Sequence, residues 1–374
     1  MINVWDYLSE YQAEKEEVHQ AIDAVLNSGR LILGQQVEEF EQCFANYVGV
    51  GYGVGVNSGT DALFLALKCL GIGEGDEVVT VANTAVPTVS AIISTGAIPK
   101  FIDIDPASYL MDVGQIESVI TPRTKCILPV HLYGQCVDMD AVNAIAEKYS
   151  LAVLEDCAQA HGACYAGKKA GSMSTLSAFS FYPTKILGGF GDAGMIVTDD
   201  ASHYEKLKRL RFYGMEGNYY ANEHGYNSRL DELHAAILLK KLTHLDDYVS
   251  RRRHLAKRYD DELAHTGLHC PVQLENREHA YYVYVCRHHW RQQWMASLKE
   301  KGIHTNISYP WPIHTMKAYQ YLGYKDGDLP NTEVMAEQIF SLPLYPSLSD
   351  TEQDEVIAAI IDIDAEIQQE KKTA

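Results

Sequence analysis

Apolar positions between about residues 35 and 200 form patterns that alternate between helices and short buried strands. The helical patterns cover residues 36–48, 61–72, 88–96 and 139–150. The apolar runs that predict strands cover residues 53–56, 76–82, 98–104, 124–130, 151–156, 176–181 and 195–200. Strands that alternate with helices in this way predict an α/β fold, in which a mainly parallel, mixed sheet is flanked by helices.

A long helical pattern over residues 230–267 leads out of the predicted sheet region. We interpret it as the connection to a second, smaller domain. That domain contains an aromatic alternation at 279–288 that predicts a strand, a proline-rich bend at 308–316 and an acidic terminal helix. We therefore expect a large domain over residues 1–245 and a small α+β C-terminal domain over residues 246–374.

Composition narrows the classes of partner. The 374 residues include 50 acidic and 31 basic side chains, a formal net charge of -19. Such a charge repels nucleic acid and anionic lipid, so we expect neither as a partner. We also find no signal peptide and no apolar segment long enough to span a bilayer. Eight scattered cysteines without a C-x-x-C pair indicate reduced thiols, no metal site and a cytoplasmic protein.

The stretch "VNSGTDALFLAL" joins a predicted strand directly to a helix through Asn57, Ser58, Gly59 and Thr60. Free backbone N–H groups at a helix N-terminus, together with small hydroxyl residues, are what a phosphate group requires. A plain N-cap, in which Ser58 or Thr60 only caps the helix, explains the same residues equally well.

The stretch "LAVLEDCAQAHG" places Asp156 at the end of an apolar strand, where a carboxylate is costly to bury without a cationic partner. The N–H of a pyridinium ring would be such a partner. Gln159 could then reach an oxygen on the ring, and His161 could stack or only pack. A purely structural aspartate is the alternative.

The stretch "AFSFYPTKILGGFGDAG" carries a single lysine, Lys185, and Ser180 precedes it on the same predicted strand end. Most lysines are solvated surface charges, but Phe179, Phe181 and Ile186 are poor neighbours for a surface position. An amine held among such residues is a candidate nucleophile toward an aldehyde.

A fourth stretch, "HGYNSRLDELHAA", places Asn227 and Arg229 before a helix that begins with Asp231 and Glu232. Arg229 could bind a substrate carboxylate or simply pair with these acids, and the spacing does not separate the two interpretations.

Together these stretches resemble the DegT–StrS family of sugar aminotransferases, which belong to the fold type I enzymes that use pyridoxal 5'-phosphate. The resemblance covers nearly the whole chain. It rests on the ordered set "SGRLILGQQVEEFE", "GVNSGTDAL", "GDEVVTVANT", "PVHLYGQCVDMDA", "EDCAQAHGA", "AFSFYPTKILGGFGDAG", "NSRLDELHAA" and "IFSLPLYPSL".

The resemblance implies roles for several residues around the cofactor. Lys185 would hold the cofactor's aldehyde covalently and later move a proton between substrate and cofactor, while Asp156 would pair with the pyridine nitrogen. Gln159 would contact the ring hydroxyl. The phosphate would be held by residues from three segments: Gly59, Thr60, Ser180 and, from the other subunit, Asn227. A homodimer with shared active sites is therefore expected.

The family also implies a substrate. Its members transfer an amino group, usually from glutamate, to a keto group of a nucleotide-linked deoxysugar, here resembling most the enzymes that act at C3 of a dTDP-linked sugar. The side chains expected on the sugar side are Tyr182, Arg229, Tyr309 and His314. The alternatives are amination at C4 of a UDP- or GDP-linked sugar and a non-catalytic cofactor-binding sensor. A dehydratase is disfavoured, because those relatives replace the lysine with histidine.

One departure from the family bears on the cofactor ring. Many relatives carry an aromatic residue where this chain has Ala85, so another group must cover that face of the ring or the face is less completely covered.

Overall fold

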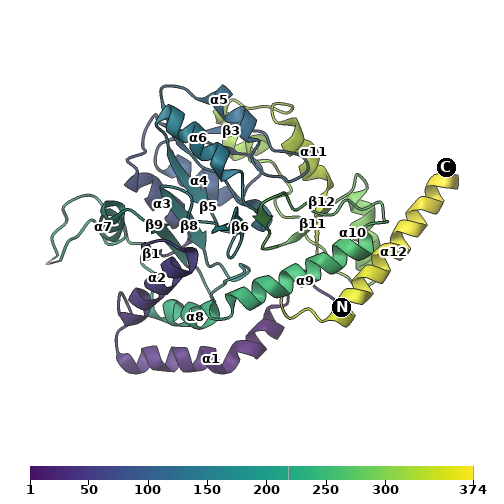
Figure 1. The fold of residues 1–374 in the computed structure, drawn as a ribbon, viewed down its shortest axis with the longest axis horizontal. Helices are drawn as coiled ribbons and strands as arrows, with labels where there is room; N and C mark the ends of the chain where they lie inside the picture. The colour runs from purple at the N-terminus through teal and green to yellow at the C-terminus, as the bar shows by residue number, and fades with distance from the viewer. Residues whose placement is uncertain (218, 374) are drawn as a thin grey trace.

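A computed structural model describes residues 1–217 and 219–373 of the chain (Figure 1). Its main feature is a seven-stranded sheet in the order β1-β9-β8-β5-β4-β2-β3. The strands are β1 (Tyr52–Val56), β2 (Glu77–Val81), β3 (Ile98–Ile102), β4 (Thr124–Ile127), β5 (Ala152–Asp156), β8 (Leu176–Ser180) and β9 (Gly194–Thr198). Strands β3, β2, β4, β5 and β8 run parallel, and β9 pairs antiparallel with β8 and β1. The predicted mixed, mainly parallel sheet is confirmed.

Helices flank this sheet (Figure 1). The helices that pack directly on it are α2 (Gln35–Val48), α3 (Gly59–Cys69), α4 (Val86–Ser94), α5 (Ile116–Val119), α6 (Met139–Tyr149) and α7 (Ala201–Leu210). Helix α8 (Glu232–Leu242) packs on α2, α1 (Tyr7–Ser28) packs on α8, and α9 (Leu245–Leu263) follows α8. Helix α3 packs against β8, β9 and β5, and α6 packs against β4 and β5. Because every residue of β2, β8 and β9 is buried, these strands are apolar runs without alternation, which is why the sequence pattern located them.

The C-terminal part of the chain has its own core. Strands β11 (Tyr284–Arg287) and β12 (Ile339–Leu342) pair antiparallel. They share this core with α9 and with the helices α10 (Arg291–Glu300) and α12 (Asp350–Thr373), whereas α11 (Pro330–Gln338) contributes its buried Met335 to the core of the main sheet. The N-terminal Ile2 joins this second core through a bridge to Ile303. The division of the chain at residues 245 and 246 stays a prediction.

Short elements complete the order. These are the strands β6 (Cys164–Tyr165), β7 (Lys168–Lys169) and β10 (Arg277–Glu278), and the 3-10 turns η1 (Val113–Gln115), η2 (Leu132–Gly134), η3 (Ile313–Thr315) and η4 (Lys317–Leu322). The buried Asp103, at the end of β3, accepts hydrogen bonds from the N–H groups of Asn331 and Thr332 at 2.8 Å. This carboxylate therefore fastens the start of α11 to the main sheet.

Two predicted elements differ from the structure. The helical pattern over 230–267 forms two helices, α8 and α9, which are separated at residues 243–244. The strand predicted over 279–288 is confined to β11, because Tyr281 has a φ of +50° and the buried Arg252 binds the carbonyl oxygens of Tyr281 and Tyr282. Both breaks arise from tertiary contacts that periodicity does not record.

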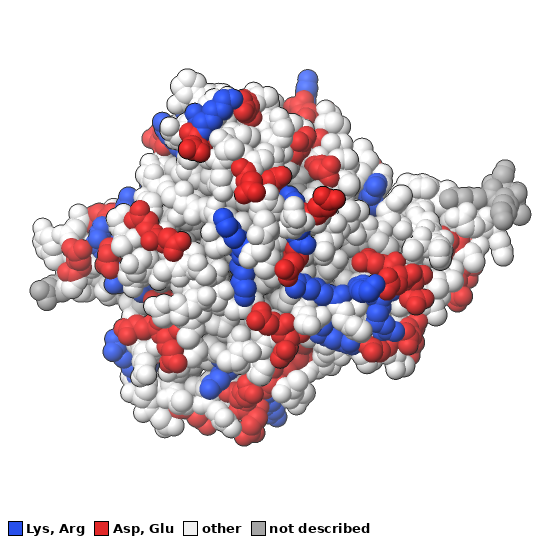
Figure 2. All heavy atoms as spheres, viewed as in Figure 1, with Lys and Arg blue, Asp and Glu red and all other residues white. Residues whose placement is uncertain are grey.

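The charged surface agrees with the acidic composition. On the face drawn in Figure 2, acidic side chains are spread widely and basic side chains lie among them. None of the helices within residues 1–217 and 219–373 is long and apolar enough to cross a membrane.

Candidate active site

A cavity of about 510 Å³ lies at the carboxyl ends of β5 and β8, beside the N-terminus of α3. Ligands of open α/β sheets bind at this end of the strands. Its lining brings together five of the predicted site residues from three separate stretches of sequence, Gly59, Thr60, Asp156, Ser180 and Lys185. Two predicted substrate-side residues, Tyr182 and Tyr309, also line it.

Asp156 is the last residue of β5, and only 4% of its surface is exposed. Its carboxylate accepts hydrogen bonds from two neutral donors, the Thr88 hydroxyl at 2.8 Å and the Ala158 N–H at 3.1 Å. Burial raises the pKa of Asp156 above its usual value, and these hydrogen bonds and the charge of Lys185 offset only part of that rise. A buried carboxylate whose charge is only partly compensated by its neighbours fits a cationic ligand group such as a pyridinium N–H.

Lys185 lies in the turn after β8, where its N–H donates to the carbonyl of Tyr182 at 2.8 Å. Its Nζ lies 4.6 Å from the centre of the Tyr282 ring. The Tyr282 hydroxyl is hydrogen-bonded to Thr184 at 3.0 Å, which fixes the ring on which the amine rests. Among the described residues no carboxylate lies within ion-pair distance of this amine, which rests on a π face and is available to react with an aldehyde.

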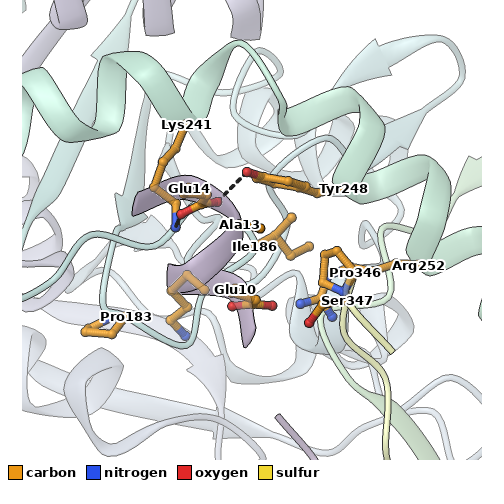
Figure 3. A pocket seen from close by; sticks show the side chains of 11 residues that line it. Glu10, Ala13, Glu14, Pro183, Ile186, Lys241, Tyr248, Arg252, Pro346 and Ser347 are labelled. Carbon is orange, nitrogen blue, oxygen red and sulfur yellow. Dashed lines mark hydrogen bonds and ion pairs between the residues drawn. The ribbon is translucent and has the colours of Figure 1, made fainter. Parts of the chain in front are cut away.

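Lys185 also lines a second, smaller cavity of about 210 Å³, enclosed by α1, α8, α9 and the Pro346–Ser347 segment (Figure 3). Glu14 is engaged there by Lys241 at 2.8 Å and by the hydroxyl of Tyr248. Glu10 and Arg252 face the same cavity, and burial raises the pKa of Glu10. Lys185 therefore lines two cavities, one that contains Asp156 and one that contains Glu10 and Arg252.

Of the two interpretations of "VNSGTDALFLAL", the N-cap is observed, and the phosphate site stays a prediction. Ser58 is the N-cap of α3, because its hydroxyl accepts the N–H of Asp61 at 3.1 Å. The N–H groups of Gly59 and Thr60 belong to the first helical turn, which has no acceptor within the helix. With Ser180 beside them, they form a cradle that fits a phosphate group at the positive end of the helix dipole.

Gly59 owes its place in this cradle to its missing side chain. A Cβ on Gly59 would lie 2.5 Å from the Cβ of Ser180. We therefore expect Gly59→Ala to push α3 away from β8, and to weaken binding of a phosphate-bearing cofactor roughly ten-fold or more. Cofactor titration of the purified protein measures this.

Gly73→Ala is the matched control, since a Cβ there would meet nothing closer than 3.8 Å. If Gly59→Ala bound the cofactor as tightly as Gly73→Ala does, the cradle would not be the phosphate site.

Four predicted residues, Gln159, Asn227, Arg229 and His314, do not line the cavity of this protomer. Asn227 is exposed, and its carbonyl accepts a hydrogen bond from the Asn57 side chain at 3.0 Å. The Arg229 guanidinium stacks 5.2 Å from the centre of the Phe212 ring. His314 is fully buried, and its Nε2 is bonded to Glu333 at 3.0 Å.

Gln159 is placed behind the cavity wall. Its Oε1 accepts the N–H of Tyr133 at 2.6 Å, and its Nε2 donates to the hydroxyl of Tyr309 at 2.5 Å. The amide thus positions the Tyr309 side chain, which does line the cavity. His161 is buried among Phe44, Phe179 and Phe181, and burial lowers the pKa of its imidazole to about 3. Of its two predicted uses, packing is the one observed.

Comparison with known proteins identifies the family to which the chain belongs. The DegT/DnrJ/EryC1/StrS aminotransferase family matches the chain over residues 12–361. The chain belongs to this family. The resemblance drawn from the motifs is confirmed, and the protein is an aminotransferase, hence an enzyme.

Individual relatives align over almost the full length of the aminotransferase. The dTDP-3-amino-3,4,6-trideoxy-alpha-D-glucose transaminase of Micromonospora megalomicea is 52% identical over 366 residues, covering 96% of this chain and 98% of the relative. The S. venezuelae DesV structure, solved with a ketimine intermediate, matches with a TM-score of 0.94 and 41% identity over 97% of each chain. NtdA from Bacillus subtilis, solved with the cofactor PMP, has a TM-score of 0.88 and 33% identity over 94% of this chain and 82% of its own.

Some cavity residues of the aminotransferase were missed from the sequence. Thr88 hydrogen-bonds Asp156, and Tyr282 lies under Lys185. Thr88 begins a helical pattern and Tyr282 lies within an aromatic run, so each resembled a packing residue. Ala85 lines the cavity beside Val86 and Pro87.

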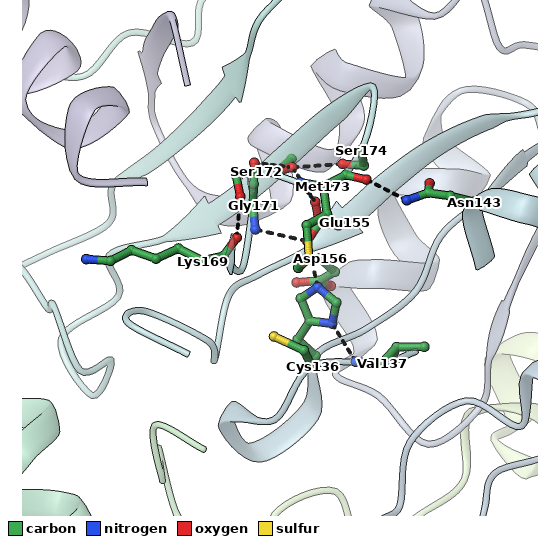
Figure 4. A network of polar contacts seen from close by, with 12 residues as sticks. Cys136, Val137, Asn143, Glu155, Asp156, Lys169, Gly171, Ser172, Met173 and Ser174 are labelled. Carbon is green, nitrogen blue, oxygen red and sulfur yellow. Dashed lines mark hydrogen bonds and ion pairs between the residues drawn. The ribbon is translucent and has the colours of Figure 1, made fainter. Parts of the chain in front are cut away.

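A second buried acid of the aminotransferase, Glu155, supports the strand that presents Asp156 (Figure 4). Its carboxylate accepts from Gly171 N–H at 2.9 Å and Met173 N–H at 3.0 Å, and is bonded to His131 Nε2 at 2.8 Å. Burial acts to raise the pKa of Glu155, but the His131 hydrogen bond and the backbone donors outweigh it and leave the pKa below its usual value.

The ligand atoms of His131, Glu155 and Cys157 lie within 4.8 Å of one another, as in a metal site. However, the Nδ1 of His131 accepts the N–H of Val137 at 3.1 Å, which leaves the ring proton on Nε2 to donate to Glu155. Both ring nitrogens are thus committed, and the arrangement is a structural hydrogen-bond network.

We expect Glu155→Gln to lower the free energy of unfolding of the aminotransferase by roughly 3 kcal/mol at pH 7. The reason is that the side-chain NH2 group of glutamine would face N–H groups from which the carboxylate now accepts hydrogen bonds. Since the folded pKa lies below the unfolded one, this stabilisation is complete above the ordinary glutamate pKa of about 4.3. It is lost as the pH falls further. Urea unfolding at several pH values measures both effects.

Glu147→Gln, at an exposed position of α6, is the control for that experiment. The role given to Glu155 would be contradicted if both variants lost the same free energy of unfolding, or if the loss in Glu155→Gln did not shrink below pH 4.

Proposed function

We propose that the aminotransferase binds pyridoxal 5'-phosphate in the 510 Å³ cavity and transfers the amino group of glutamate to the C3 keto group of a dTDP-linked deoxysugar. Two relatives, at 52% and 43% identity, are named as transaminases of dTDP-linked 3-amino sugars. The B. subtilis structure with bound PMP supports the cofactor.

The observation that carries this proposal is the shared cavity of Asp156 and Lys185, one a buried carboxylate and the other a lysine held on an aromatic face. When bound, pyridoxal phosphate supplies an electron sink for the carbanion formed at the substrate carbon. The Asp156 carboxylate would hold the proton on the ring nitrogen. The Lys185 amine would bind the aldehyde and, after displacement by the donor, move the proton at the substrate carbon.

The remaining lining residues account for the two ends of the ligand. Gly59, Thr60 and Ser180 would bind the phosphate at the N-terminus of α3. Tyr182 and Tyr309 would contact the sugar. The small side chains of Ala85 and Ala158, which also line the cavity, would leave room for the cofactor ring.

The test is a pair of half-reactions followed by the visible absorbance of the purified protein. Glutamate is expected to bleach the cofactor band, and a dTDP-linked 3-amino sugar is expected to do the same in the reverse direction. Faster bleaching by a UDP- or GDP-linked 4-amino sugar would replace the C3 assignment with C4. A spectrum that no amino donor changes would mean a non-catalytic sensor.

We further propose that the active form is a homodimer in which the exposed Asn227 completes the partner's phosphate site. The support is that Asn227 is exposed and is not among the described residues that line the cavity of its own chain.

Mixing two inactive variants tests this. A Lys185→Ala chain and an Asn227→Asp chain form a hybrid dimer with one intact site if Asn227 acts across the interface. We expect mixing under exchange conditions to restore activity that neither variant has alone. If the mixture stays inactive although hybrid dimers form, Asn227 does not complete the partner's site.

A further inference from the structure

Two cysteines of the C-terminal core lie opposite each other on neighbouring backbone segments. His269 and Arg287 form an antiparallel bridge, with reciprocal N–H to carbonyl hydrogen bonds of 3.1 and 2.9 Å. Cys270 and Cys286 are the next facing pair along this ladder. In antiparallel pairing, the position after a hydrogen-bonded pair is a non-hydrogen-bonded pair, whose Cα atoms are about 4.5 Å apart and whose side chains share a face.

The side chains of the two cysteines meet in one core. Cys286, within β11, is fully buried, and Cys270 is partly buried and packs against the same cluster. A hydrogen bond from the Cys286 thiol lowers the pKa of Cys270. A Cα separation of this size lies within the range that disulfides span, roughly 4.4–6.8 Å. Facing positions at such a separation are compatible with a disulfide.

Only one of the two thiols faces an opening. Cys270 lines a surface cavity of about 530 Å³, together with His269, Asp260 and Arg287. A small oxidant can enter this cavity and reach the partly buried Cys270, whereas Cys286 is fully buried in the core. An accessible thiol of lowered pKa beside a buried partner is the arrangement of an oxidisable cysteine and its resolving cysteine.

From this geometry we propose that Cys270 and Cys286 are a redox modification site, which peroxide converts to a reversible disulfide. The Cys270 thiolate attacks hydrogen peroxide and becomes a sulfenic acid as the O–O bond breaks and hydroxide leaves. The proton that the thiol had lost converts this hydroxide to one water. The Cys286 sulfur then displaces the hydroxyl group as a second water. Two thiols and one peroxide thus give one disulfide and two waters, and a dithiol reductant restores both thiols.

Trypsin makes the test direct, because Arg277 separates the two cysteines and Arg258 and Arg287 bound their peptides. The holoenzyme is treated with hydrogen peroxide, denatured in acid, alkylated and digested. We expect residues 259–277 to appear linked to residues 278–287, with a mass about 2 Da below the sum of the two thiol peptides. Dithiothreitol should separate them.

Two variants sharpen the result. Cys270→Ser should leave Cys286 fully alkylated after peroxide, whereas Cys43→Ser, which removes an exposed thiol of α2, should keep the linked peptides. The proposal is overturned if wild-type protein oxidises Cys270 to a sulfinic or sulfonic acid while Cys286 stays alkylated. It is also overturned if the linked peptides join other cysteines, or if peroxide leaves both thiols free.

Discussion

Lys185→Ala is expected to lower kcat for amino transfer by about four orders of magnitude or more, while the protein stays folded. The substitution removes the amine that faces the cavity beside Asp156 and, with it, the proposed covalent anchor and proton carrier. Its cost in stability is small, since the side chain contributes a cation–π contact to Tyr282 worth about 1 kcal/mol. Single-turnover absorbance with glutamate measures the loss, and thermal unfolding checks the fold.

Lys185→Arg tests, in the same experiment, whether the positive charge of Lys185 is sufficient without its primary amine. It keeps a cation in the cavity but carries no amine able to bind an aldehyde, so we expect it to be as inactive as the alanine variant. Lys240→Ala, at an exposed position of α8, should retain full activity. Near-normal turnover in either Lys185 variant would remove the lysine from the mechanism.

Asp156→Asn is expected to lower kcat by roughly 100- to 1,000-fold, because the amide keeps the shape of the carboxylate but not its charge. Without that charge, the bound ring nitrogen should lose its proton at a lower pH. A pH titration of the cofactor's absorbance in the variant and the wild type measures this shift. Thermal unfolding of the apoprotein shows whether Asp156 also stabilises the fold. Because burial raises the pKa of this carboxyl, its charge is unfavourable without a cationic partner, and we expect the apo form of Asp156→Asn to unfold at an equal or higher temperature than the wild type.

Thr88→Val is the matched control for Asp156→Asn. It removes the 2.8 Å hydrogen bond to the carboxylate and leaves the charge in place, so a loss of about ten-fold is expected. If Thr88→Val and Asp156→Asn were equally impaired, the charge of Asp156 would not be the property that matters.

The fold could be predicted from the sequence where burial alone defines an element. β2, β8 and β9 are buried at every position, and their apolar runs located them correctly. The pattern failed where a distant side chain interrupts the backbone, as Arg252 does at the carbonyls of Tyr281 and Tyr282. The long N-terminal helix α1 was not predicted either, since few of its residues are buried and its apolar stripe is correspondingly narrow.

The sequence by itself determined the groups on which the proposed chemistry depends: an amine, a carboxylate and a helix N-terminus, each at or just after the end of a buried strand. Parallel strands end at the same edge of a sheet, so these groups had to converge. Only the tertiary structure decided their surroundings, such as the Thr88 hydroxyl on Asp156, the Tyr282 ring under Lys185 and the cysteine pair across β11. Such contacts join residues that are remote along the chain or divided by loops, and their distances depend on how whole layers pack, which no local pattern of apolar and polar positions encodes.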